Sequence, residues 1–315
     1  MASLSQGSLV VVFGGSGFVG RHVVQSLTKQ GYRVRVAVRR PNEALFLKTA
    51  GRVGQVEIVA ANLRHAASVE AALQGASAVV NAVGILYESG KQKFMALQAE
   101  GVANLAALAA QNNIENFVQI SAIGASQQSA SRYAQSKAQG EASVVEHIPS
   151  AHILRPSIVV GPEDDFFNRF ASMALVAPAL PLIGGGTTRY QPVSVFDVAA
   201  SVTACLAGAP AGTYELGGPQ TYSFKALLEL LLVEIGRKRI LLPLPFFVAR
   251  MMASVAQFMP TPILTPDQLI LLKSDNVVTP EFADKGLEAL GIAATPIETL
   301  LPTYLRRFRP DIRTS

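Results

Sequence analysis

The first two-thirds of the chain alternates short runs of apolar, often β-branched residues with longer segments that repeat apolar residues at helical spacing. This alternation is typical of a parallel sheet that carries helices on both faces. The short runs predict strands at residues 9–13, 33–38, 56–60, 78–81, 116–120 and 152–154. The segments between them predict helices near residues 19–30, 43–50, 66–73, 94–111 and 132–146. The pattern therefore predicts an α/β fold with a doubly wound parallel sheet.

The pattern changes after Pro156. It predicts a helix at 166–176, a Pro- and Gly-rich loop at 178–186, a strand at 189–193, a helix at 195–206 and a strand at 213–216. From Ser223 onward the periodicity is mostly helical. We therefore expect one domain over residues 7–220, with an excursion at about 163–187, and a smaller, mostly helical C-terminal lobe over 221–315.

Three glycines lie between the first predicted strand and the first predicted helix. Gly14, Gly17 and Gly20 follow one another at three-residue spacing. Glycines let a strand turn sharply into a helix and let a pyrophosphate approach bare backbone N–H groups. The pattern predicts a Rossmann-type, NAD(P)-binding domain whose pyrophosphate site is formed by Gly14, Ser16, Gly17, Phe18, Val19 and Gly20.

Two arginines, Arg39 and Arg40, directly follow the second predicted strand. In a dinucleotide-binding fold this position meets the adenine ribose, with an acid for a free 2′-hydroxyl or an arginine for a 2′-phosphate. The guanidinium fork matches phosphate geometry, so the pair favours NADP(H) over NAD(H). The alternative is that both are solvated side chains at a strand end.

Two further segments follow predicted strands. Asn62 and Leu63 come after the third strand, where such folds contact the adenine. Ala82, Val83 and Gly84 come after the fourth, where small residues line the wall beside the cofactor. Each segment is also compatible with an ordinary turn.

Tyr133 and Lys137 are one helical turn apart and therefore share a helix face. A lysine ammonium beside a phenol lowers the pKa of the phenol toward working pH. The same lysine can hold the nicotinamide ribose, so both residues are candidates for cofactor binding as well as catalysis. Ser121, which follows the fifth predicted strand, is the third candidate catalytic residue.

Together these motifs resemble an atypical extended short-chain dehydrogenase/reductase. The resemblance includes residues 155–162, and it implies that Pro156 and Ile158 lie beside the nicotinamide. Active members carry a Ser or Thr near the end of the fifth strand, at a position that falls near Ala122 here. Ala122 has no hydroxyl, and Ser121 or Ser126 would have to substitute. A lost oxyanion contact often costs about 10²-fold or more in rate, so we expect cofactor binding with little or no turnover.

The C-terminal third narrows the resemblance. Its segments 217–219, 242–246, 264–268, 273–278 and 302–310 are similar to those of bacterial relatives of the nucleotide-binding accessory subunit of respiratory complex I, the NADH:quinone oxidoreductase. This resemblance implies a tightly held, structural NADP(H). It also implies docking on complex I subunits near the quinone-binding end of the peripheral arm, on the cytoplasmic side of the inner membrane.

Composition limits the remaining classes of function. Charged residues make up 16% of the chain and apolar residues 50%. The excess of apolar side chains must be covered by a deep core, by a partner protein or by a membrane surface. Arginines cluster at 33–40 and 306–313, which suits phosphates or lipid headgroups better than a nucleic-acid groove. One cysteine and four scattered histidines argue against a disulfide or a metal site. The chain start shows no signal-peptide pattern, so we expect a cytoplasmic protein.

Residues 240–266 carry a single charge, Arg250. Prolines restrict the helix in this stretch to about residues 246–259, which is too short to cross a bilayer. One alternative is a helix packed on its own lobe. The other is a helix that meets a partner protein or lies among membrane headgroups.

Three functions remain open from the sequence. The first is the NADP(H)-binding accessory subunit that stabilises complex I. The second is an active NAD(P)-dependent reductase or epimerase, acting on a sugar nucleotide or a quinone-pathway intermediate. The third is a redox-sensing regulator that releases partners as the NADPH/NADP⁺ ratio changes.

Overall fold

The computed structural model of the chain describes residues 4–257, 262 and 264–310. The chain divides into two compact units. Unit 1 comprises Met1–Pro156, Phe196–Leu216 and Thr279–Ala293, and unit 2 comprises Ser157–Val195, Gly217–Val278 and Ala294–Ser315. Residues 279–293, which the sequence pattern placed in the C-terminal lobe, group with unit 1.

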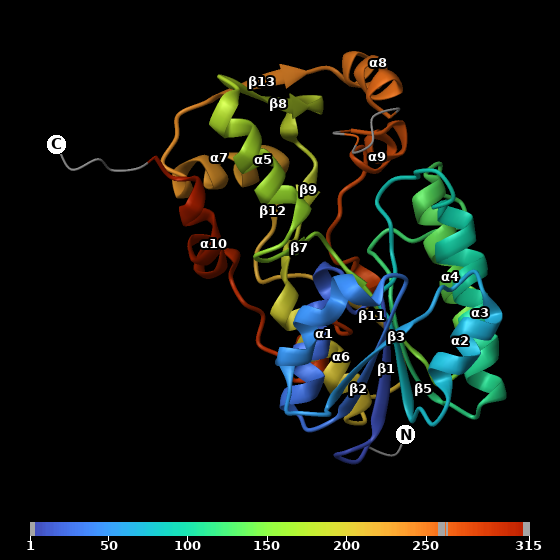
Figure 1. The fold of residues 1–315 in the computed structure, drawn as a ribbon. Helices are drawn as coiled ribbons and strands as arrows, with labels where there is room; N and C mark the ends of the chain where they lie inside the picture. The colour runs from blue at the N-terminus through green and yellow to red at the C-terminus, as the bar shows by residue number, and fades with distance from the viewer. Residues whose placement is uncertain (1–3, 258–261, 263, 311–315) are drawn as a thin grey trace. The chain divides into compact units, whose positions relative to one another are not determined.

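Unit 1 is built on a seven-stranded sheet in the order β11-β6-β5-β4-β1-β2-β3 (Figure 1). Every neighbouring pair is parallel. The winding reverses between β1 and β4, as in a doubly wound Rossmann-type fold, so the predicted fold class is confirmed. The strands are β1 (Leu9–Phe13), β2 (Arg33–Val38), β3 (Val56–Ala60), β4 (Ala78–Asn81), β5 (Asn116–Ile120), β6 (His152–Pro156) and β11 (Gly212–Leu216).

Helices cover both faces of this sheet, which explains why its central strands are continuous apolar runs. On one face lie α2 (Ala66–Leu73), α3 (Glu100–Gln111) and α4 (Arg132–His147) (Figure 1). On the other lie α1 (Phe18–Lys29) and α6 (Val195–Leu206), joined by a 2.8 Å hydrogen bond between Ser26 and Thr203. All five residues of β1 are buried.

A buried ionic network holds the last segment of unit 1. Arg155 of β6 donates to both carboxylate oxygens of Glu141, at 3.0 and 2.6 Å. It also lies 3.7 Å from Glu215 of β11. Glu215 accepts the backbone N–H of Thr279 at 2.8 Å, and its own N–H donates to Lys285. This network ties residues 279–293, with the short helices η4 (Pro280–Phe282) and η5 (Glu288–Leu290), to the edge of the sheet.

Several predicted elements differ from those observed. The helix predicted at 43–50 is the 3₁₀-helix η1 (Pro41–Ala50). The helix predicted at 94–111 begins with a π-helical turn, η2 (Met95–Ala99), before α3. The loop predicted at 178–186 was wrong: β8 (Ala179–Ile183) pairs with β13 (Ile240–Leu244), and η3 (Gly184–Gly186) follows. Pro181 is tolerated because the pair forms a two-stranded sheet in which β8 is an edge strand.

Unit 2 also contains short strand pairs around its helices. The strand predicted at 189–193 is two separate two-residue strands, β9 and β10. The Asp164 side chain caps α5, accepting the N–H of Phe167, and it also accepts the Tyr304 hydroxyl from α10. The further elements are β7 (Val159–Val160), α5 (Asp165–Val176), β9 (Arg189–Tyr190), β10 (Val193–Ser194), β12 (Tyr222–Ser223), α7 (Phe224–Glu234), α8 (Phe246–Ala256), α9 (Pro266–Leu271), α10 (Ile297–Leu305) and η6 (Arg306–Phe308).

The helix predicted over 246–259 corresponds to α8, which ends at Ala256. Residues 258 and 259 lie outside the described part of the chain. Within the described ranges, none of the helices is both long enough and apolar enough to cross a membrane.

Candidate functional site

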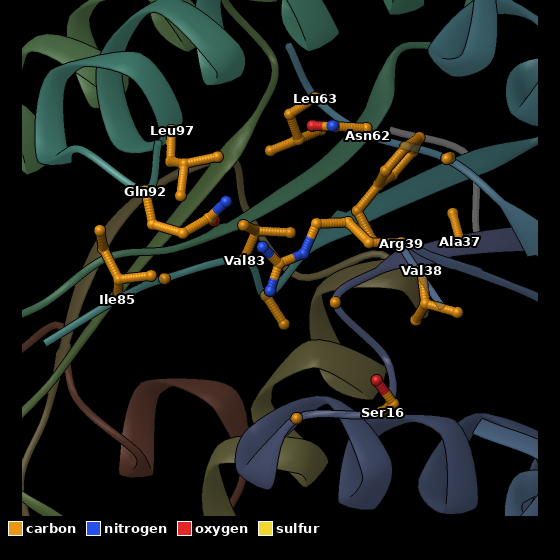
Figure 2. Close-up of a pocket in the computed structure, with 16 residues that line it drawn as sticks. Ser16, Ala37, Val38, Arg39, Asn62, Leu63, Val83, Ile85, Gln92 and Leu97 are labelled. Carbon is orange, nitrogen blue, oxygen red and sulfur yellow. The ribbon is translucent and has the colours of Figure 1, made fainter. Parts of the chain in front are cut away.

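A pocket in unit 1 lies at the carboxyl ends of its central strands (Figure 2). The end of β1 contributes Phe13 and Gly14, and the segment after β3 contributes Asn62 and Leu63. This edge, beside the reversal of winding, is where doubly wound sheets bind ligands. The lining residues are Phe13, Gly14, Ser16, Gly17, Ala37, Val38, Arg39, Ala61, Asn62, Leu63, Ala82, Val83, Gly84, Ile85, Gln92 and Leu97.

The turn between β1 and α1 is close-packed backbone. Gly14 has a φ of +75°, and a Cβ built there would lie 3.0 Å from backbone atoms of Ala82 and Val83. A Cβ on Gly20 would lie 2.2 Å from the carbonyl oxygen of Gly14. Only glycine therefore fits either position, and the close approach brings the first turn of α1 to the pocket.

Of the predicted pyrophosphate residues, Gly14, Ser16 and Gly17 line the pocket, whereas Phe18, Val19 and Gly20 form the first turn of α1. Gly17 caps α1 without a side-chain hydrogen bond. The first N–H groups of a helix need acceptors, and its positive dipole end favours an anion. This arrangement suits a phosphate group.

Sequence reasoning missed Arg21, which braces this turn. Its guanidinium donates to the carbonyl oxygens of Ser16 at 3.1 Å and Gly17 at 3.3 Å. It also lies 4.9 Å from the centre of the Phe46 ring. Arg21 therefore holds the turn between β1 and α1 and also contacts η1 through Phe46. No spacing pattern in the sequence marks this arginine.

The two arginines after β2 differ in their surroundings. Arg40 donates to Glu43 at 2.8 Å, and both side chains are exposed. Within the described ranges Arg39 forms no ion pair, and Figure 2 shows it reaching over the pocket from the β2 side toward Val83 and Gln92. A second cavity, lined by Ser16, Val38, Arg39, Arg40 and Glu43, adjoins the first. The uncompensated positive charge beside the pocket is therefore that of Arg39.

Side-chain amides shape the walls of the pocket. Buried Asn81 accepts the N–H of Val83 at 3.1 Å and donates to Gln119 at 2.9 Å, which fixes the turn that carries Ala82, Val83 and Gly84. Asn62 accepts the N–H of Arg64 at 3.2 Å, so its oxygen is used within its own turn. Leu63 is buried and presents an apolar surface.

Three pocket residues that follow Gly84 in the chain were not predicted as part of the site. Ile85, Gln92 and Leu97 line the pocket. The Oε1 atom of Gln92 is buried and lacks a hydrogen-bond partner within the described residues. Gln98, in the π-helical turn, accepts the N–H of Ile85 at 3.2 Å and donates to Ser136 at 3.1 Å. These contacts span distant parts of the sequence, so local periodicity carried no signal for them.

Tyr133 and Lys137 lie near each other on α4, with the Lys137 Nζ 5.9 Å from the centre of the Tyr133 ring. Phe94 packs edge-on against that ring, with centroids 5.7 Å apart. Lys137 is buried and donates to the carbonyl oxygen of Ile120 at 3.2 Å. A Cβ on Gly84 would lie 3.5 Å from this Nζ, so the lysine adjoins the Gly84 end of the pocket.

Burial lowers the pKa of Lys137 to about 8, although the nearby Glu141 carboxylate opposes this effect. The Oγ atom of Ser121 is buried and without a hydrogen-bond partner among the residues described. Its backbone N–H donates to Leu154 at 2.7 Å. Ala122, next along the chain, offers no hydroxyl. The candidate proton-transfer group is therefore the Tyr133–Lys137 pair, for which Ser121 and Ser126 are the candidate hydroxyl partners.

Two predicted nicotinamide neighbours belong to different units. Pro156 ends β6 in unit 1. Ile158 belongs to unit 2, where its N–H donates to Asn276 at 3.1 Å. Their role toward a nicotinamide ring stays a prediction. Within the described ranges, no group of three or more His, Cys, Asp or Glu side chains is arranged to hold a metal ion.

The chain is similar to known proteins along nearly its whole length. Residues 10–217 match the model of the NAD-dependent epimerase/dehydratase family. The mitochondrial NADH dehydrogenase (ubiquinone) 1 alpha subcomplex subunit 9 of Arabidopsis thaliana is 35% identical over 312 residues, covering 94% of this chain and 78% of that protein. The ceramide reductase of Caulobacter vibrioides is 30% identical over 247 residues, covering 78% of this chain and 76% of the reductase. The crystal structure of gox2253 has the same fold, with a TM-score of 0.73, 22% identity and coverage of 95% and 98% of the two chains.

We expect Gly20→Ala to destabilise the protein, although alanine usually stabilises the interior of a helix by about 0.5–1 kcal/mol. The added Cβ meets the Gly14 carbonyl and forces α1 away from β1. Thermal or denaturant unfolding should show a loss of about 1–3 kcal/mol. The control is Gly286→Ala, whose Cβ would make an ordinary 3.6 Å contact. Equal stability of the two variants would contradict the close packing.

We also expect Lys137 to make stability depend on pH. Its pKa is about 8 in the folded protein and 10.5 in a free lysine, so between these values the unfolded chain binds more protons. The free energy of unfolding should therefore rise with pH across this window, by up to about 3 kcal/mol relative to Lys137→Met. Denaturant titrations of both proteins at pH 7.5 to 10.5 measure the difference. Parallel pH profiles of the two proteins would show that the pKa of Lys137 is not lowered in the folded protein.

Proposed function

The chain belongs to the NAD-dependent epimerase/dehydratase family, and we propose that it is an NADP(H)-binding accessory subunit of respiratory complex I, the NADH:quinone oxidoreductase. The match to the Arabidopsis NADH dehydrogenase subunit carries this proposal. It covers 94% of the chain, whereas the family model ends at residue 217. The similarity therefore extends through most of the C-terminal third. If the two proteins shared only a nucleotide-binding domain, this third would not match.

The pocket of unit 1 fits a dinucleotide. The glycine turn leaves room for backbone contact with a pyrophosphate, and the free first turn of α1 favours its charge. Asn62 and Leu63 would flank the adenine, and Ala82, Val83 and Gly84 would form the central wall. The buried, unpaired oxygen of Gln92 supplies an acceptor that a ribose hydroxyl would satisfy.

Arg39 supports NADP(H) as the form bound. Its charge is not neutralised by a neighbouring carboxylate, and together with Arg40 and Ser16 it lines the second cavity beside the pocket. A 2′-phosphate placed there would receive charge-assisted hydrogen bonds from the guanidinium. Glu43, the acid nearest in sequence, is already paired with Arg40.

We assign the cofactor a structural role. A bound nicotinamide cofactor supplies hydride-transfer chemistry, but this chain has Ala122 at the position where a hydroxyl would orient a substrate carbonyl. Tyr133 and Lys137 would then hold the nicotinamide ribose, with Pro156 near the ring. A ligand that binds only the folded state stabilises it by about 4 kcal/mol at a thousandfold excess over Kd.

The second candidate is an active NAD(P)-dependent reductase. The observation that favours it is the intact Tyr133–Lys137 pair beside the pocket, together with the similarity to a ceramide reductase. In this case Tyr133 would donate the proton to a substrate carbonyl and Ser121 would stand in for the missing hydroxyl. Oxidation of NADPH with candidate carbonyls, abolished in Tyr133→Phe, would establish the enzyme. Cofactor binding without such turnover favours the accessory subunit.

Membrane association follows from the proposed assembly. We place the protein near the quinone-binding end of the peripheral arm, associated peripherally with the cytoplasmic side of the inner membrane. The support is the resemblance of its C-terminal third to the complex I relatives, and no helix in the described ranges could anchor it by spanning the bilayer.

Arg39→Ser should weaken NADPH binding by about tenfold or more, because it removes the charge that meets the 2′-phosphate. NADH affinity should change little, since NADH carries no phosphate at that position. Calorimetric titration of the emptied protein with each coenzyme gives both affinities. Arg52→Ser is the matched control, because Arg52 is exposed and lies outside both cavities. A parallel loss for both coenzymes would contradict the assignment of Arg39.

Affinity capture from detergent-solubilised native membranes tests the proposed assembly. We expect complex I subunits to be recovered with the tagged protein, and nucleotide to be retained in the same fraction. Arg39→Ser should lower the yield of the complex if the cofactor stabilises the docked form. Recovery of the protein without complex I subunits would contradict the proposal.

A further inference from the structure

Helix α8 presents its large apolar side chains outward. Phe247, Met251 and Val255 recur at four-residue spacing and are 74%, 68% and 75% exposed. The inward face carries Ala249 and Ala253, both fully buried. A helix that merely packs on its own domain shows the reverse order, with bulky side chains inside and polar ones outside.

Strand β13 leads into α8 (Figure 1), and it also carries exposed apolar side chains. Ile240 and Leu242, at alternate positions of β13, are 68% and 55% exposed. Alternate residues of a strand point to the same side. With Met252, the segment 240–255 therefore holds six strongly exposed large apolar side chains.

Within residues 235–266 every charged side chain is basic. Between residues 235 and 266 the chain has Arg237, Lys238, Arg239 and Arg250 and no acidic residue. Arg237 and Arg239 donate only to backbone carbonyls, of Phe308, Ala174 and Lys238. In the part of the chain described, none of the four cations is paired with a carboxylate. Lys238 and Arg250 are also exposed, so their charge is available to an external partner.

From these observations we propose that α8 and β13 form a docking surface for an anionic lipid bilayer. The stripe Phe247–Met251–Val255 would enter the boundary between headgroups and acyl chains, and the exposed Lys238 and Arg250 would meet lipid phosphates. An apolar helix face bordered by Lys and Arg is the composition of interfacial helices, and each basic residue near an anionic surface contributes to binding. A protein interface would be expected to bring acceptors for these cations, or acids of its own at the rim, and this segment has no acid.

The surface also has the dimensions for this role. With 11 residues, α8 is about 16 Å long, which lets it lie in the headgroup plane but not span the bilayer. Phe247, Met251, Met252 and Val255 fall within an arc of about 140° at 100° per residue, and Arg250 lies outside that arc. The proposal does not rest on the complex I assignment, because it uses only the exposure and charge of residues in unit 2.

Vesicle flotation of the full-length protein tests the proposal. We expect binding to vesicles of phosphatidylcholine mixed with phosphatidylglycerol, and little binding to phosphatidylcholine alone. Met251→Glu should reduce the partition coefficient by about tenfold or more. Arg250→Gln should reduce only the part that depends on anionic lipid and on low salt. Val53→Glu, which adds a charge at a fully exposed valine of unit 1, is the matched control and should bind like wild type.

Unfolding curves and NADPH titrations of each variant show whether the fold and the nucleotide pocket are intact, so failure here is separable from failure of the proposed function. Absence of wild-type binding to anionic vesicles would overturn the proposal. Equal binding by Met251→Glu and wild type would overturn it as well. If vesicles fail to bind but Met251→Glu no longer captures complex I subunits, a protein partner covers α8 and the lipid proposal is wrong.

Discussion

The site depends on one close contact between two backbone segments, where the first turn of α1 meets the end of β1. A Cβ on Gly20 would lie 2.2 Å from the Gly14 carbonyl, so the contact requires glycine at position 20. Gly14 is required for a second reason, its φ of +75° and the close approach of Ala82 and Val83. This contact brings the positive end of α1 to the carboxyl edge of the sheet, where the walls after β2, β3 and β4 converge. Arg21 then holds the turn from outside.

The two units divide the proposed functions between them. The nucleotide pocket is lined entirely by unit 1, which also contains the Tyr133–Lys137 pair. The outward apolar stripe of α8 and its cations belong entirely to unit 2. This division suits the proposed accessory subunit, because the cofactor would stabilise one unit while the other would carry contacts with the membrane. Ala122 agrees with the proposed role, since it has no hydroxyl to offer a substrate, while the proposed ribose-binding pair, Tyr133 and Lys137, is in place.

Local patterns predicted those features that short segments specify. The six strands of the prediction, the glycine turn and Arg39 beside the pocket all follow from residues that act near their own place in the chain. What failed depended on distant partners: β8 was taken for a loop because its partner β13 lies some 60 residues later. Gln98 was missed for the same reason, since its side chain bonds to Ile85 and Ser136. Arg21 binds carbonyl groups of its own turn and Gln92 lies in a loop, and no spacing pattern marks either residue. The outward face of α8 was visible as a ring of apolar residues, but only its buried Ala249 and Ala253 show which side faces out.

The central claim is that the pocket of unit 1 permanently holds a phosphorylated nicotinamide dinucleotide. The direct measurement is to purify the protein from its native cells without added nucleotide, denature it, and identify the released small molecules by mass spectrometry. We predict NADP(H) at close to one molecule per chain. Recovery of no nicotinamide dinucleotide, together with no heat on adding either coenzyme to the folded protein, would contradict the account.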